Sequence, residues 1–343
     1  MSSLVFPAEL SIPASSRVDV RKHLAIGSRV VIGERVRISC DSLVLADGAQ
    51  IEDDVTIDVR EFSLGAESRV ETRCRIAAMR GAADRVRIGD FSFLGHDSKL
   101  LVPIAIIGDY VAIQHHALLN GRKPLLMGHN CWIGQNCILN AEENLTIGNN
   151  VGIGAYSSVY THGYFGDLLE GSQVFKVAPV VIEDDVWILG SYNVVSPGVV
   201  IGEKALVLTG SNVTRDVPSN HTVGGAPARD MTDRLVPYRP RTVAEKIEMV
   251  RGFIAEFVES QPEGAFVVVV REELGSESDL PAERPLLVFT GTESPLPRWP
   301  GVTIFSVASR RYTKWRTAPE IAMMSFLKSY RARFVPDDEQ VVC

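Results

Sequence analysis

His162 is one of the seven histidines of this sequence, the residue type whose side chain can gain or lose a proton near neutral pH. An imidazole can take a proton from an alcohol and so turn the alcohol oxygen into a better nucleophile. General-base help of this kind contributes typically about 10² to 10⁴ in rate. By spacing alone, a surface histidine beside a loop is the simpler interpretation. No carboxylate adjoins His162 in the sequence, so Glu142 and Glu143 are candidates either to orient the imidazole or to hold an acceptor.

The stretch that must position such groups is a repeat of six residues. Between residues 182 and 218 an aliphatic residue opens each block, namely Ile182, Ile188, Val195, Ile201, Val207 and Val213. The fifth residue of one block and the first of the next lie two apart, so in a strand both point inward. A fixed period of six predicts a parallel β-helix, in which each block buries its face only against stacked neighbours. The block 188–194 carries an extra residue, which we expect to bulge its strand.

The repeat extends from Ile26 to Pro218, which leaves room for roughly ten triangular turns. Residues 77–85 and 119–126 break its phase and are expected to be loops. Residues 163–177 leave the pattern entirely. A loop of this length inside a compact repeat is usually functional or disordered, so the segment is a candidate cover for an acceptor site.

The side chains of the segment 163–177 suit a ligand with many hydroxyls. Tyr164 and Phe165 would stack on a sugar face, and Asp167 and Glu170 would bind hydroxyl groups. Ordinary loop residues are the alternative interpretation of all four.

After Arg229 the repeat stops, and a different pattern begins. Residues 237–243 are a proline-bearing linker, 243–260 and 319–334 have helical spacing, and 265–270, 285–290 and 302–307 are short apolar runs typical of buried strands. The expected organisation is therefore a β-helix domain over 1–235 and a small α/β domain over 236–343. A basic stretch at 309–316 would meet phosphates or an acidic partner, or is a solvated loop.

Composition narrows the class of protein. The formal net charge of −7 over 343 residues argues against a general nucleic-acid binder. No apolar run approaches the roughly 20 residues that cross a bilayer, and residues 1–20 lack the apolar core of a signal peptide. The five cysteines fit no disulfide framework, and Cys131 and Cys137 occupy small inward positions. We therefore expect a cytoplasmic protein with reduced thiols.

Part of the repeat resembles a known family. Over 133–229 the chain is similar to the maltose- and galactoside-type sugar O-acetyltransferases, which are hexapeptide-repeat acyltransferases. The residues that carry the resemblance are Asn136, THG at 161–163, DDVWILGS at 184–191, SPGVVIG at 196–202, TGSNVTRDVP at 209–218 and VGGAPAR at 223–229. It implies a mainly β fold with a left-handed parallel β-helix, and homotrimers with active sites between neighbouring helices. It also implies acetyl-CoA as co-substrate and no permanently bound cofactor.

The resemblance also implies roles for single residues. His162 would be the general base, Asn136 would contact the acceptor sugar, and the backbone amide of Ser191 would bind the oxyanion. Trp187 would line the pantetheine or acceptor side. The remaining acetyl-CoA contacts would come from Thr209, Thr214, Arg215 and Arg229. A second basic residue of the family pattern is replaced here by Thr232.

Other functions were weighed against this one. N-acetylation of an amino sugar, or acetylation of an antibiotic, would differ only in the acceptor. His115-His116 faintly resembles the paired histidines of metal-dependent carbonic anhydrases with this fold, but Asn120 stands where they have a histidine ligand. His96 and His129 would substitute only through unusual geometry, so no metal site is expected. A scaffold without chemistry is disfavoured because His162, Trp187 and Arg229 occur together.

Overall fold

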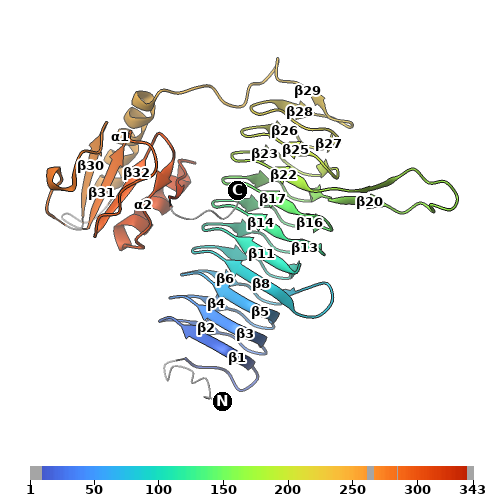
Figure 1. Ribbon diagram of the computed structural model, residues 1–343. Helices are drawn as coiled ribbons and strands as arrows, with labels where there is room; N and C mark the ends of the chain where they lie inside the picture. Colours follow the sequence, from blue (N-terminus) through green and yellow to red (C-terminus); the bar gives the residue numbers. More distant parts are fainter. Residues whose placement is uncertain (1–9, 261–265, 284, 338–343) are drawn as a thin grey trace. The chain divides into compact units, whose positions relative to one another are not determined.

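The computed structural model describes residues 10–260, 266–283 and 285–337. They form two compact units that divide after Tyr238 (Figure 1). The first unit is built of strands, and the second combines strands with helices. Three expectations fall partly outside the described residues: the lack of a signal peptide over 1–20, the strand that begins at Ala265, and the domain ends at Met1 and Cys343.

The six-residue period builds a solenoid in the first unit. Parallel pairings join one inward aliphatic residue from each rung into a column, which runs Ile26, Leu45, Leu64, Ile88, Ile107, Met127, Ile147, Ile182, Ile201 and Val217. The described part of the chain therefore contains ten rungs, as expected. Burying these residues and the other inward positions supplies the main driving force for stacking. Cys131 and Cys137 are buried in this core, where their thiols donate to the backbone oxygens of Gly148 at 3.1 Å and Gly154 at 3.2 Å.

Three faces surround the core. One sheet contains β1 (Arg17–Ile26), β3 (Arg37–Leu45), β5 (Thr56–Leu64), β7 (Arg75–Ala77), β8 (Ala83–Ile88), β10 (Lys99–Leu101), β11 (Ile104–Ile107), β13 (Leu118–Gly121), β14 (Leu125–Met127), β16 (Ile138–Ala141), β17 (Leu145–Ile147), β19 (Ser158–Val159), β22 (Val180–Ile182), β24 (Val194–Val195), β25 (Val200–Ile201) and β27 (Asn212–Val213). The long strand β5 pairs with both β7 and β8, so beyond this rung the sheet continues as two faces.

The third face is a separate sheet. It contains β2 (Val31–Ile32), β4 (Gln50–Ile51), β6 (Arg69–Val70), β9 (Phe93–Leu94), β12 (Ala112–Ile113), β15 (Trp132–Ile133), β18 (Gly152–Ile153), β23 (Trp187–Ile188), β26 (Leu206–Val207), β28 (Thr222–Gly224) and β29 (Arg229–Asp230). The strands from β2 to β28 are parallel, and β29 closes this face by antiparallel pairing with β28.

Side chains at one corner satisfy backbone donors of the neighbouring rung. The backbone N–H of Asp90 donates to Asp109 Oδ1 at 2.7 Å, and that of Asp109 donates to His129 Nδ1 at 2.9 Å. The N–H of His129 donates in turn to Asn149 Oδ1 at 2.9 Å. Because an unpaired buried backbone donor is costly, this ladder helps to hold the rungs in register.

Two expected interruptions of the repeat need correction. Residues 119–126 are not a loop, because Leu119 pairs with Leu139 and Leu125 pairs with Leu145 in regular register. Both residues are fully buried, so this rung is complete. The phase is hidden in the sequence because Leu119 and Met127 lie eight residues apart instead of six, and the extra residues lie in the corner between β13 and β14. The other break, expected over 77–85, is shorter, since β7 ends at Ala77 and β8 begins at Ala83.

Residues 162–177 leave the solenoid as an arm. Strands β20 (His162–Tyr164) and β21 (Phe175–Val177) pair antiparallel, and the hairpin projects away from its rung (Figure 1). Its apolar side chains are largely exposed, with Phe165 and Leu169 almost fully open to solvent. The segment that leaves the repeat pattern is thus an ordered hairpin at its base.

The second unit is a small α/β fold, as the spacing of its apolar residues predicts. It contains α1 (Val243–Glu259), β30 (Val267–Arg271), the 3₁₀ turn Glu277–Asp279, β31 (Leu286–Thr290), β32 (Val302–Ser306), β33 (Arg311–Tyr312), α2 (Ala318–Ser329) and β34 (Val335–Pro336). Strands β30, β31 and β32 are parallel, and β33 runs antiparallel to β32. In the described ranges, no helix is both long and apolar enough to cross a membrane.

Candidate active site

His162 lies where the chain leaves the solenoid, as the first residue of β20. Its imidazole is half-buried, and its Nδ1 lies 2.7 Å from Oδ1 of Asn140 at the end of β16, one rung away. The ring of Tyr164 from the arm lies 5.2 Å from the imidazole, centroid to centroid, and that of Tyr160 lies edge-on at 6.2 Å. The imidazole is therefore fixed from below by the solenoid and flanked by the arm.

Two neighbours set which way the Asn140 amide faces. Its Nδ2 donates to the backbone oxygen of Asn120 at 3.3 Å, and its Oδ1 accepts from the backbone N–H of Glu142 at 3.3 Å. Oδ1 is therefore the atom that faces His162, and it can only accept, so the imidazole carries its proton on Nδ1. The lone pair of Nε2 is then free, which is the state that a general base needs.

Glu142 and Glu143 occupy the corner beside this pair. The Glu142 carboxylate pairs with Arg122 at 3.1 Å, and Glu143 Oε1 accepts from the backbone N–H of Asn144 at 3.0 Å. Thr161 links the corner to the site, because its Oγ1 accepts from the backbone N–H of Glu143 at 2.9 Å. The group that orients His162 is thus Asn140, a residue that sequence reasoning missed.

The arm carries the remaining residues expected at the acceptor. Tyr164 is 40% exposed and stacks on Phe175, with ring centroids 5.2 Å apart. Asp167 caps the turn at the tip, where its Oδ1 accepts from the backbone N–H of Leu169 at 2.8 Å. Phe165 points fully into solvent, and Glu170 is also exposed. Of these side chains, Tyr164 is the one that contacts His162.

The extra residue of block 188–194 lies in a corner and not, as expected, in a strand. Ile153 and Ser158 pair with Ile188 and Val194, so the corner between them widens from four residues to five. Gly190 takes a positive φ of 70° within this corner, and its carbonyl lies against Gly154 of the rung below. The longer corner keeps the strand register and changes only the path of the backbone around Ser191.

Three expected acetyl-CoA residues gather at this widened corner. The indole of Trp187 is 54% exposed on the outer face of β23. Thr209 lies one rung further on, and its Oγ1 donates to the backbone oxygen of Leu189 at 3.2 Å. The backbone oxygen of Ser191 accepts from the N–H of Gly210 at 3.0 Å. Asn136 lies at the same corner, two rungs earlier than the one that holds Ser191.

His162 and Ser191 do not meet within one chain. Strands β19 and β24 pair in parallel, with Val159 opposite Val195. His162 follows the end of β19, whereas Ser191 precedes the start of β24. The two residues therefore lie at opposite ends of the same strands, and Asn136 lies at the Ser191 end.

The last expected acetyl-CoA residues lie beyond β27. Thr214 and Arg215 are exposed at the end of this strand, on the His162 side of the face. Arg229 is exposed in β29, opposite Gly224. Thr232 stands where the family pattern has a basic residue, and its side chain carries no charge that could bind phosphate. Its Oγ1 accepts a hydrogen bond from the backbone N–H of Thr222 at 3.1 Å.

Comparisons with known proteins agree with the repeat pattern. No family model matches the chain. Over 135 residues, 39% of this chain, it is 30% identical to the galactoside O-acetyltransferase of Escherichia coli (strain K12), and the match covers 66% of that protein. Over 106 residues, 31% of this chain, it is 34% identical to the putative acetyltransferase YJL218W of Saccharomyces cerevisiae, and the match covers 54% of that protein.

Among solved structures, the UDP-N-acetylglucosamine acyltransferase of Arabidopsis superposes with a TM-score of 0.44 and 18% identity, over 74% of this chain and 85% of that one. The chain spans just under two thirds of the first relative and about half of the second. The period of six, the three parallel faces and the two relatives found by sequence lead to one assignment: the chain belongs to the hexapeptide-repeat acyltransferases, proteins with a left-handed parallel β-helix.

Proposed function

We propose that this protein transfers an acetyl group from acetyl-CoA to a hydroxyl of a sugar, a nucleotide sugar or a polysaccharide precursor. The observation that carries the proposal is the hydrogen bond between His162 and Asn140, because it leaves Nε2 of the imidazole ready to accept a proton. The catalytic unit is the β-helix domain over 1–235, and the domain over 236–343 has no assigned role. The reaction takes place in the cytoplasm.

The reaction needs one proton transfer and one charge stabilisation. Nε2 of His162 takes the proton of the acceptor hydroxyl while its oxygen attacks the thioester carbonyl. The backbone N–H of Ser191 donates to the oxyanion of the tetrahedral intermediate. Collapse of the intermediate expels the CoA thiolate, which receives the proton from His162. The acceptor gains the acetyl group, and free CoA leaves.

A homotrimer completes such a site. Because His162 and Ser191 lie at opposite ends of the same strands, the widened corner of one chain would face the His162 end of its neighbour. Trp187 and Thr209 would then line the acetyl-CoA arm together with Thr214, Arg215 and Arg229. Asn136, Glu142, Glu143, Tyr164 and Asp167 would surround the acceptor.

The test is thiol release from acetyl-CoA, measured with and without sugar acceptors. His162→Ala is expected to lower transfer by about 10² to 10⁴ and to leave acetyl-CoA binding by calorimetry unchanged. His23→Ala is the matched control, because His23 is exposed on β1 at the far end of the solenoid. An acceptor panel that pairs hydroxyl sugars with amino sugars separates O- from N-acetylation. Failure of the wild type to bind acetyl-CoA would overturn the proposal.

A further inference from the structure

Stacking gathers histidines at one corner of the solenoid, away from His162. His96 and Asp97 lie in the corner between β9 and β10, and His115 and His116 lie in the corner between β12 and β13. The backbone N–H of His116 donates to the backbone oxygen of His96 at 3.0 Å, so the two corners stack directly. Residues about 20 apart in sequence thus become neighbours.

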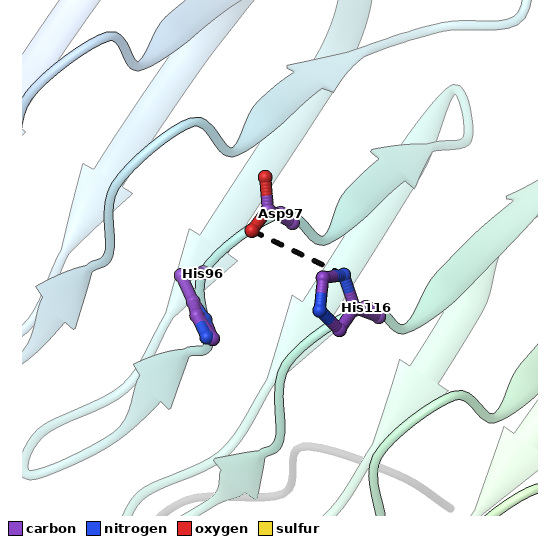
Figure 2. Close-up of side chains that lie close together, drawn as sticks. All are labelled: His96, Asp97 and His116. Carbon is purple, nitrogen blue, oxygen red and sulfur yellow. Dashed lines mark ion pairs between the residues drawn. The ribbon is translucent and has the colours of Figure 1, made fainter.

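Three of these side chains turn toward one another, as Figure 2 shows. His96, Asp97 and His116 each offer one ligand atom, and these atoms lie within 4.8 Å of one another. Oδ2 of Asp97 lies 4.0 Å from Nδ1 of His116. A metal ion between such atoms needs only small side-chain rotations to bring them into its coordination sphere.

His96 gives a second, independent observation. Its Nδ1 is buried and has no hydrogen-bond partner, although buried polar atoms are normally paired. The imidazole of His115 packs edge-on against His96, with centroids 4.7 Å apart, and closes one side of the cluster. His116 leaves the other side open, because half of its side chain is exposed. An ion therefore has a route from solvent to the cluster.

Arg73 holds the carboxylate of the cluster in place. It donates from Nε to Asp97 Oδ1 at 2.7 Å and from Nη2 to Asp97 Oδ2 at 2.6 Å. These two bonds fix the orientation of the Asp97 carboxylate at the corner. Each carboxylate oxygen has two lone pairs, so Arg73 leaves acceptor capacity for a cation. The positive charge of Arg73 repels a cation near Asp97. Most of the binding free energy of an ion must therefore come from the two imidazoles.

We propose that His96, Asp97 and His116 bind a divalent first-row transition metal ion of the Zn²⁺ type. Two imidazoles and a carboxylate suit Zn²⁺, Co²⁺ and Ni²⁺, whereas Mg²⁺ and Ca²⁺ prefer an all-oxygen shell. Three protein ligands leave a fourth position to water. The ion would join two successive rungs at their corner and so stabilise the solenoid. The cluster lies at the same corner of the solenoid as Asn136, whose backbone N–H donates to the backbone oxygen of His115 at 3.1 Å, and at the opposite end of the strands from His162.

The test uses untagged full-length protein with CoCl₂ and ZnCl₂ as probes. Wild type is expected to bind one Co²⁺ per chain, with visible ligand-field absorption, and to show a higher melting temperature with Zn²⁺. Loss of a residue that only holds a metal ligand in place lowers metal affinity by about 10- to 100-fold. His116→Ala and Asp97→Asn each remove a direct ligand, so each should lower Zn²⁺ affinity by about 100-fold or more. His221→Ala is the matched control, because His221 faces a single carboxylate, Asp230, at 3.7 Å.

The two variants keep the test valid even if replacing half-buried His96 disturbs the fold. Both change side chains at the open side of the corner, and circular dichroism checks their structure. Equal Zn²⁺ affinity in wild type and His116→Ala would overturn the proposal. Absence of Co²⁺ binding by the wild type would overturn it as well, as would a preference for Mg²⁺ or Ca²⁺ over Zn²⁺.

Discussion

At the scale of single residues, Asn140 decides the protonation of His162. Its amide is held by the backbone of Asn120 on one side and of Glu142 on the other, so it can offer only an acceptor to the imidazole. A side chain held in this way selects one tautomer of the histidine without supplying a charge. This differs from the carboxylate partner that Glu142 or Glu143 would have provided.

Replacing Asn140 by alanine should therefore lower acetyl transfer by about tenfold, because one hydrogen bond of about 1 kcal/mol and the tautomer preference are lost. Acetyl-CoA affinity should stay the same. The measurement is the steady-state rate of thiol release, for the single variants and for Asn140→Ala combined with His162→Ala. The double variant should be no slower than His162→Ala alone, since Asn140 acts through the imidazole. Additive losses would contradict this role.

A flanking motif singled out His162 in the sequence, but no local signal pointed to Asn140. The two residues are 22 positions apart in the sequence, and no recognisable motif contains both of them. The one usable signal was the length of a rung, about 20 residues, which places Asn140 beneath His162. The same rule would have paired His96 with His116. Contacts across rungs follow from the period, but side-chain direction does not.

At the scale of elements, the period of six predicted the rungs correctly, but it did not predict the lengths of some corners between strands. Inward aliphatic residues can be read directly from the sequence because strands alternate sides. The corners vary in length, so an extra residue can lie there without changing the register, as it does between Ile188 and Val194. Leu119 and Leu125 show the same effect, since both pair in regular register on either side of a corner that is longer than the period of six allows.

The widened corner makes a prediction about Gly154. A Cβ added to Gly154 would lie 1.5 Å from the backbone oxygen of Gly190, so the corner that carries Ser191 would have to move. Gly154→Ala should destabilise the solenoid by about 1–3 kcal/mol or more. Acetyl-CoA affinity should also fall. Thermal unfolding followed by the β-sheet signal in circular dichroism measures the first effect, and calorimetry measures the second.

Gly252→Ala is the control for this substitution. Gly252 lies within α1 with open space around its Cα, so alanine should stabilise the helix by about 0.5–1 kcal/mol. Both α-helices of the described residues belong to the second unit, so the helical signal near 222 nm reports on that unit. A neutral Gly154→Ala variant would show that the two backbones do not press together at this corner.

At the scale of the whole molecule, the order of strands limits what one chain can do. The base and the oxyanion donor that we propose lie at opposite ends of the strands β19 and β24. Neither the composition nor the period reveals that His162 and Ser191 lie at opposite ends. Their motifs, at 161–163 and 184–191, are close in the sequence, and both match the family pattern. The site that we propose would therefore need the surfaces of two copies, and a closed ring of three would supply three such sites.

Mixing two inactive variants tests this arrangement. His162→Ala lacks the base, and Ser191→Pro lacks the backbone N–H because proline has none. Refolded together in equal amounts, the variants should recover about one quarter of the wild-type sites, since a quarter of the interfaces would join an intact His162 end to an intact Ser191 corner. Light scattering should give three times the 37.5 kDa mass of one chain. A mixture that stays inactive, although each variant assembles, would show that every site is built within a single chain.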